Sequence, residues 1–460
     1  MAKRRPTRAP RSLETDFPVI SEPAALPVTG GPTRFIVTFR DDAIGKPQVM
    51  RSALRSTTGA RSMALASDFA GSALNLEETG GADAILFEQL GIAVVTGDRT
   101  AHRNMAVAAA SDSGNILAVE PEGFMTASAQ LSKDYLRGFR DAAQRLYEMS
   151  DGGAPLAPFM PLPSDAPAEM EAEAATDFTW GINATRANTS RFSGQGIRVA
   201  VLDTGFDFDH PDFLGRSVLQ QSFIRGQSAQ DGNSHGTHCI GTACGPKSPA
   251  TGPRYGVAHE STIFVGKVLN NAGSGPDTSV LAGMEWATTN RCQVISMSLG
   301  SQRPQMTAYN QAGQRALNAG CLVVAAAGND SDRRIGRILP VACPANSGPI
   351  MAVAALDRQL QVAFFSNRSG TVAGAKVDIS GPGVRVYSST PEPAVPPRKP
   401  RYDFLDGTSM ATPHVAGCAA LWCQATGKTG AELYQKLTSN ARATSVPSND
   451  GGAGLVQAPQ

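Results

Sequence analysis

The stretch IRVAVLD, residues 197–203, decides the fold, because a short apolar run that ends in a polar residue is typical of a buried strand. Helix-like segments alternate with this run and with others like it, which favours βαβ units around a parallel sheet. The other strand-like runs are IFVGKVL at 263–269, QVISMSLG at 293–300, CLVVAAAG at 321–328 and IMAVAAL at 350–356.

The composition narrows the class of protein. The chain has 460 residues, which at roughly 150 residues per domain allows two or three domains. Lys and Arg number 41 and Asp and Glu 40, and this balance argues against a nucleic-acid partner. No apolar run approaches the roughly 20 residues that span a bilayer, so we expect no membrane partner.

The N-terminal half is expected to be a separate unit. Residues 34–40 and 115–122 resemble strands, and residues 132–149 have a helical period. Residues 152–175 are dense in Pro, Ala and acids, which predicts a linker. We therefore expect a unit at 34–127, a helix and linker at 128–177, and a larger unit at 178–460.

The first residues of the chain do not determine in which cellular compartment the protein works. Residues 1–12 are basic, but no apolar segment follows them, so no Sec-type signal peptide is visible. Residues 1–33 fit a disordered basic tail or an address for a non-standard export route. The protein is thus expected in the cytoplasm or outside it by such a route.

Asp, His and Ser each lie beside a glycine turn in three short segments. Asp203 ends a strand, His235 precedes Gly-Thr, and Ser409 follows Gly-Thr at the start of a helix. A serine hydroxyl needs a base to accept its proton, and an aspartate can orient a histidine for that task. Asn329, after Gly328, could donate to an oxyanion together with the Ser409 amide.

Five segments in order resemble the diagnostic segments of the subtilisin-like serine proteases: VLDTG, HGTHCIGT, SMSLGS, AAAGND and GTSMATPHVAG. The resemblance covers residues 178–460 and implies a doubly wound α/β fold, with a mainly parallel central sheet and helices on both faces. It implies Asp203 as orienting acid, His235 as general base, Ser409 as nucleophile and Asn329 as oxyanion donor. Cys239 beside the histidine resembles the proteinase K branch.

The resemblance also implies a cleft in which two strands clamp an extended peptide. Because the pocket residues are uncharged, we expect a neutral apolar or aromatic residue on the acyl side of the cleaved bond. Asp277 lies where the family places the wall of a remote subsite, and it could favour a basic residue there or be a solvated loop carboxylate. The substrate-binding candidates are Gly273, Ser274, Gly275, Asp277, Ser298, Leu299, Gly300, Ala326, Ala327, Gly328, Ala342 and Thr408.

No cofactor is expected for the chemistry, and the binding of structural calcium is left open. Asp378, with the carbonyls of Gly348 and Ile350, resembles the proteinase K-type calcium site. Asp212 matches one carboxylate of the family's strong site, but the Asn-rich insertion of that site is missing. One carboxylate is not a calcium site. His238 forms an HxxH pair with His235, for which metal binding is the weaker interpretation.

The seven cysteines all follow residue 235, and their odd number means at least one free thiol unless pairing is intermolecular. Reduced structural thiols and one or two disulfides both remain open. They are Cys239, Cys244, Cys292, Cys321, Cys343, Cys418 and Cys423.

Residues 34–127 resemble the family's propeptide, a small α+β unit that assists folding and inhibits by laying its C-terminus in the cleft. The resemblance places maturation near 124–126 or in the linker before Thr179. We therefore expect a serine endopeptidase made as a zymogen, acting on proteins or peptides. The alternatives are a transacylase that makes cyclic peptides and an inactive peptide-binding protein.

Overall fold

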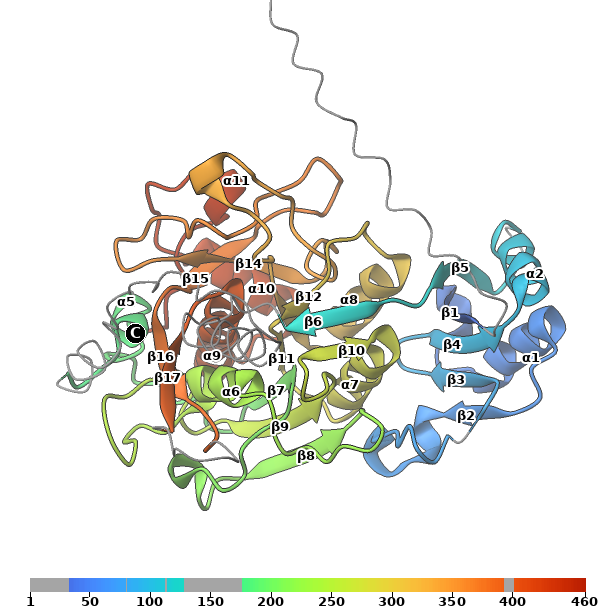
Figure 1. Cartoon of the computed structure of the whole chain (residues 1–460), viewed down its shortest axis with the longest axis horizontal. Helices are drawn as coiled ribbons and strands as arrows, with labels where there is room; N and C mark the ends of the chain where they lie inside the picture. The colour runs from blue at the N-terminus through green and yellow to red at the C-terminus, as the bar shows by residue number, and fades with distance from the viewer. Residues whose placement is uncertain (1–32, 80, 112–113, 128–175, 393–400) are drawn as a thin grey trace, which may run out of the picture.

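The computed structural model describes residues 33–79, 81–111, 114–127, 176–392 and 401–460. Two units, residues 33–127 and residues 176–460, pack side by side, with the first at the right of Figure 1. The predicted basic tail up to residue 32, the predicted helix at 132–149 and the predicted linker at 152–175 lie outside the described residues.

The larger unit is built on a seven-stranded, all-parallel sheet, so the predicted fold class is confirmed. All five predicted runs form strands of this sheet. Its order is β15-β14-β13-β11-β7-β9-β8. The strands β8 and β9 therefore lie on one side of β7, and β11, β13, β14 and β15 lie on the other. The strands are β7 (Arg198–Asp203), β8 (Val218–Ser222), β9 (Thr262–Lys267), β11 (Val294–Met297), β13 (Leu322–Ala326), β14 (Met351–Leu356) and β15 (Ile379–Pro382).

Helices cover both faces of this sheet, which is why its strands other than the edge strand β8 are largely apolar on both sides. Alternate residues of β7 belong to two different cores: Ala200 and Leu202 to one, Val199 and Val201 to the other. The first core takes in α7 (Asp277–Thr289) and α8 (Thr307–Asn318). The second takes in α6 (His235–Cys244), α9 (Thr408–Thr426) and α10 (Gly430–Ser439).

Smaller elements complete this unit. Two strands, β16 (Val386–Ser389) and β17 (Tyr402–Leu405), form an antiparallel pair that packs on α6. Two short helices lie near the beginning and the end of the sequence of this unit: α5 (Trp180–Ala184) and α11 (Ser448–Gly451). Among the described helices, none is both long and apolar enough to cross a bilayer.

The N-terminal unit is a five-stranded sheet with two helices on one face. The order is β2-β3-β4-β1-β5, and the opposite face packs on α7 and α8 of the larger unit (Figure 1). Predicted strands at 34–40 and 115–122 are confirmed as β1 and β5. The elements are β1 (Thr33–Phe39), β2 (Met63–Leu65), β3 (Ala84–Phe87), β4 (Ile92–Gly97), β5 (Ile116–Pro121), α1 (Pro47–Thr58) and α2 (Arg99–Ala109).

One strand joins the two units. After β5 the chain forms β6 (Phe124–Ala127), which lies between β10 (Ser274–Pro276) and β12 (Leu299–Gly300) of the larger unit (Figure 1). Both pairings are antiparallel. The end of the described N-terminal unit is therefore an inserted strand, held by backbone hydrogen bonds on both sides.

Candidate active site

Asp203 and His235 form a buried pair at the carboxyl edge of the central sheet. Asp203 ends β7, next to β11, where the strand order reverses and where open α/β sheets place their sites. Its Oδ1 lies 2.7 Å from Nδ1 of His235, the first residue of α6, and also accepts the Thr204 amide at 2.7 Å. Burial alone would lower the pKa of His235, but the Asp203 carboxylate outweighs it, and the pKa lies well above 6.5.

Asp231 holds the start of α6 in place, a role that the sequence reasoning missed. It accepts hydrogen bonds from the Thr204 hydroxyl at 2.9 Å and from the amide and hydroxyl of Thr237 at 2.9 and 2.7 Å. Gly236 is required beside them, since a Cβ there would lie 2.3 Å from the carbonyl oxygen of Gly205. The available signal was an acid four residues before His235, in DGNSH.

Ser409 is the second residue of α9, which packs against α6. Its hydroxyl is buried and donates to the Ser298 carbonyl at 3.1 Å. Sγ of Cys239 bridges the two helices, at 3.9 Å from His235 Nδ1 and 3.6 Å from the Ser409 carbonyl oxygen. Within the described residues, His235 Nε2 is buried without a hydrogen-bond partner. The Ser409 hydroxyl and His235 Nε2 are therefore not hydrogen-bonded to each other in this structure.

Asn329 lies where the sequence placed an oxyanion donor, just beyond β13. Its Oδ1 accepts from both the amide and the hydroxyl of Thr408, each at 2.9 Å. The Thr408 hydroxyl also accepts from the Gly328 amide at 3.2 Å. Thr408, the residue before Ser409, therefore fixes the orientation of the Asn329 amide.

The predicted substrate strands do clamp an extended segment, which is the chain's own β6. The Ala127 amide donates to the Gly273 carbonyl at 2.8 Å, and Met125 lies opposite Gly275 in the ladder. On the other side, Thr126 lies opposite Gly300. Ser274 and Gly275 of β10 and Leu299 and Gly300 of β12, with Gly273 and Ser298 beside them, thus form the two walls.

The residues predicted for the acyl-side pocket lie close together at the end of β13. Ala326 and Ala327 are fully buried, and the Ala342 amide donates to the Ala327 carbonyl at 2.9 Å. Gly328 has a φ of +106°, and a Cβ on it would lie 2.3 Å from Nδ2 of Asn367. Small, uncharged side chains therefore gather beyond the end of β13.

Comparison with known proteins decides the family. A model described as the subtilase family matches residues 194–454. The chain is 39% identical to subtilisin Savinase from Lederbergia lenta over 288 residues, 62% of this chain and 98% of that protein. It is 39% identical to subtilisin DY from Bacillus licheniformis over 241 residues, 52% of this chain and 81% of that protein.

A third relative agrees. An alkaline protease from Alkalihalobacillus alcalophilus is 38% identical over 297 residues, which are 63% of this chain and 72% of that protein. This chain belongs to the subtilase family. It is a subtilisin-like serine endopeptidase, and the family needs no cofactor for its chemistry.

Asp277 of this subtilase is not a free charge, which corrects the expectation of a basic residue opposite it. Its side chain is fully buried at the start of α7 and forms a two-point ion pair with Arg303, with Nη1 2.9 Å from Oδ2. The Tyr309 hydroxyl donates to Oδ1 at 2.8 Å. The solvated-carboxylate interpretation is also wrong, because the charge is already neutralised within the protein.

The two carboxylates considered for calcium fit that ion poorly. The Asp212 carboxylate accepts hydrogen bonds from the Ala250 amide at 2.6 Å, from the Tyr402 hydroxyl at 3.1 Å from each oxygen, and from the Tyr255 hydroxyl. At Asp378, Oδ2 accepts the Ala352 amide at 2.8 Å, and the Lys376 ammonium lies 3.2 Å from Oδ1. Calcium takes six to eight oxygen ligands, so an ion at Gly348, Ile350 and Asp378 would have to displace these donors.

The other metal and thiol candidates are structural. His238 is buried, its Nε2 lies 3.0 Å from the Val386 carbonyl oxygen, and burial lowers its pKa to about 3, so it stays neutral. In the part of the chain that the structure describes, Asp203, His235 and Cys239 are the one group with metal-ligand spacing. All seven cysteines are buried and free, in agreement with the reduced interpretation.

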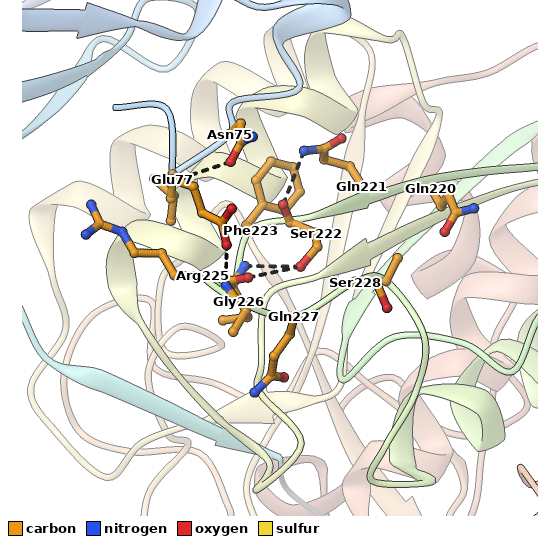
Figure 2. Close-up of a pocket in the computed structure, with 13 residues that line it drawn as sticks. Asn75, Glu77, Gln220, Gln221, Ser222, Phe223, Arg225, Gly226, Gln227 and Ser228 are labelled. Atoms are coloured by element: carbon orange, nitrogen blue, oxygen red, sulfur yellow. Dashed lines mark hydrogen bonds between the residues drawn. The ribbon is translucent and has the colours of Figure 1, made fainter. Parts of the chain in front are cut away.

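A polar hollow of about 540 Å³ lies between the two units but outside the cleft (Figure 2). Residues 220–229 line it, together with Asn75, Leu76 and Glu77 of the N-terminal unit. Glu77 accepts the Gly226 amide at 2.5 Å across it. None of the predicted site residues contributes to its wall.

Proposed function

We propose that this subtilase is made as a zymogen, in which residues 33–127 form an inhibitory unit and Asp203, His235 and Ser409 form the catalytic triad. The observation that carries the proposal is β6, which occupies the cleft between β10 and β12 at the residues expected to bind substrate. The Asp203–His235 contact of 2.7 Å supplies the base.

In the proposed reaction the Ser409 hydroxyl attacks the peptide carbonyl while Nε2 of His235 takes its proton. Asp203 holds the other ring nitrogen and stabilises the imidazolium. The Asn329 amide and the Ser409 backbone N–H would stabilise the oxyanion. His235 then protonates the leaving amine, and water hydrolyses the acyl-enzyme to release the second product.

Contacts of the N-terminal unit with two helix starts support its inhibitory role. Glu120 accepts the amides of Thr307 and Ala308 at 2.8 and 3.0 Å, at the start of α8. Glu122 accepts the Thr278 amide at 3.1 Å, at the start of α7. A carboxylate is stabilising at a helix N-terminus, since the first amides lack partners within the helix.

Contacts farther from the cleft add to the same interface. Glu285, buried on α7, accepts the amides of Gln89 and Leu90 at 2.9 Å each. The Arg315 guanidinium of α8 donates to the Phe39 carbonyl at 2.7 Å and lies 3.0 Å from an oxygen of Asp41. The N-terminal unit is thus held to α7 and α8 by charge-assisted hydrogen bonds as well as by its apolar face.

The strand register supports a first cut just beyond Ala127. Ala127 lies opposite Leu299, and the residue before Leu299, Ser298, accepts the Ser409 hydroxyl. In a peptide that continues this register, the residue after Ala127 would lie opposite Ser298. The peptide bond that follows that residue would then lie at Ser409. We therefore place the first cut within two residues after Ala127, in place of residues 124–126 or the end of the linker.

The test compares the wild type with Ser409→Ala, and with Ser439→Ala as a matched control because Ser439 is exposed at the end of α10. Wild type and control should convert the 48.0 kDa chain to a shorter form and clear casein, and Ser409→Ala should do neither. N-terminal sequencing of the shorter form locates the cut. Equal casein clearing by all three proteins would refute the serine mechanism.

A further inference from the structure

Asp277, Arg303 and Tyr309, here named the outer subsite, contact the segment that enters the cleft. Asp277 binds one residue of that segment, Gly123, at two points. Its backbone N–H donates to the Gly123 carbonyl at 3.0 Å, and its Oδ2 accepts the Gly123 N–H at 2.7 Å. These bonds continue the ladder in which Pro276 lies opposite Phe124.

The space around Gly123 admits no side chain. A Cβ there would lie 2.2 Å from Nη1 of Arg303 and 3.5 Å from Oδ2 of Asp277. Arg303 is not free to move aside, because both of its terminal nitrogens are bonded to Asp277 and Tyr309 fixes the same carboxylate. A larger residue would therefore have to break a largely buried ion pair.

The residue two positions later is selected by a different property. Met125 is fully buried, and its sulfur lies 3.6 Å from Nη2 of Arg303. A methionine side chain offers polarizable apolar contact there, whereas a lysine would bring a second cation to the guanidinium. Phe124, between the two, is 66% exposed and so contributes little.

We propose that the outer subsite makes this protease selective for peptides with glycine two residues before a buried apolar residue, the pattern Gly-x-Met of residues 123–125. Arg303 excludes side chains at the glycine position, and Asp277 forms two hydrogen bonds with the backbone of that glycine. The inference rests on the proposed function, since it requires that the cleft that holds β6 also binds and cuts separate peptides.

The experiment uses the processed wild-type enzyme and internally quenched peptides of the sequence PEGFMTASAQLS, residues 121–132. Replacing the peptide glycine by alanine should lower kcat/KM about 10- to 100-fold, as expected for losing a hydrogen bond to a charged group. Replacing the methionine by lysine should lower it by a similar factor. Replacing the phenylalanine by alanine is the control and should change it less than about threefold.

Two enzyme variants separate selectivity from folding. Arg303→Ala should bring the glycine-to-alanine ratio of kcat/KM below about three, since the excluding group is gone. The neutral double variant Asp277→Asn with Arg303→Gln should also reduce this ratio, and it leaves no buried charge unpaired. A ratio near one in the wild type overturns the inference while peptide cleavage upholds the proposed function. Cleavage of neither casein nor peptide by the wild type would overturn the proposed function itself.

Discussion

Two buried aspartates at the edge of the cleft have partners of different kinds. Asp203 is paired with His235, whose charge depends on pH, and Asp277 is paired with Arg303, which stays protonated in proteins. The first pair can therefore take up and release a proton during a reaction. The second is a permanent ion pair that can only position and exclude. The partner, more than the burial, determines what a buried carboxylate does here.

Asp203→Asn should have the largest effect on rate. The amide would keep the hydrogen bond but favour the wrong tautomer of His235 and no longer stabilise its charge, so kcat should fall about 10⁴-fold. Casein hydrolysis and the rate of the first cut both measure this. Stability should change much less than activity, and unfolding curves of the same protein provide that control. A loss of activity below tenfold would contradict the assigned role.

Asp277→Asn should have the opposite effect to Asp203→Asn, because it should lower stability more than activity. Removing the carboxylate leaves the mostly buried Arg303 without its anion, which typically costs about 3–5 kcal/mol. Denaturant unfolding of the uncut chain, in the Ser409→Ala background, measures the change. The double variant with Arg303→Gln is expected to recover part of it. An unchanged unfolding midpoint for Asp277→Asn would show that the ion pair is not a structural contact.

The pH dependence of the first cut gives the smallest effect, about tenfold per pH unit on the acid side. Protonated His235 cannot accept the Ser409 proton, and in the uncut chain its pKa lies above 6.5. The rate should therefore rise with pH along a limb whose midpoint is above 6.5. Asp277→Asn should leave the midpoint of this limb unchanged, because Arg303, the partner of Asp277, stays protonated throughout this pH range. A midpoint at or below 6.5 would contradict the effect assigned to Asp203.

Local patterns predicted the fold and identified the candidate catalytic residues that the structure places near one another. A strand buried on both faces is a short apolar run, and Asp203, His235 and Ser409 each lie beside the glycines that their turns require. The partner of Asp277 was missed because Arg303 comes from another segment, 26 positions later, and nothing near Asp277 in sequence indicates it. Asp212 accepts hydrogen bonds from Tyr255 and Tyr402, which come from distant segments of the chain. No pattern near Asp212 in the sequence indicates these partners.

Because β6 is covalently part of the chain whose cleft it occupies, the two meet at an effective concentration that does not depend on how dilute the protein is. An outside peptide would have to compete with that value for as long as residues 128–175 remain intact. Once the connection is cut, the same contacts become those of two separate molecules, and simple dilution weakens their association. After the cut, a dilute preparation should therefore lose the N-terminal unit sooner than a concentrated one.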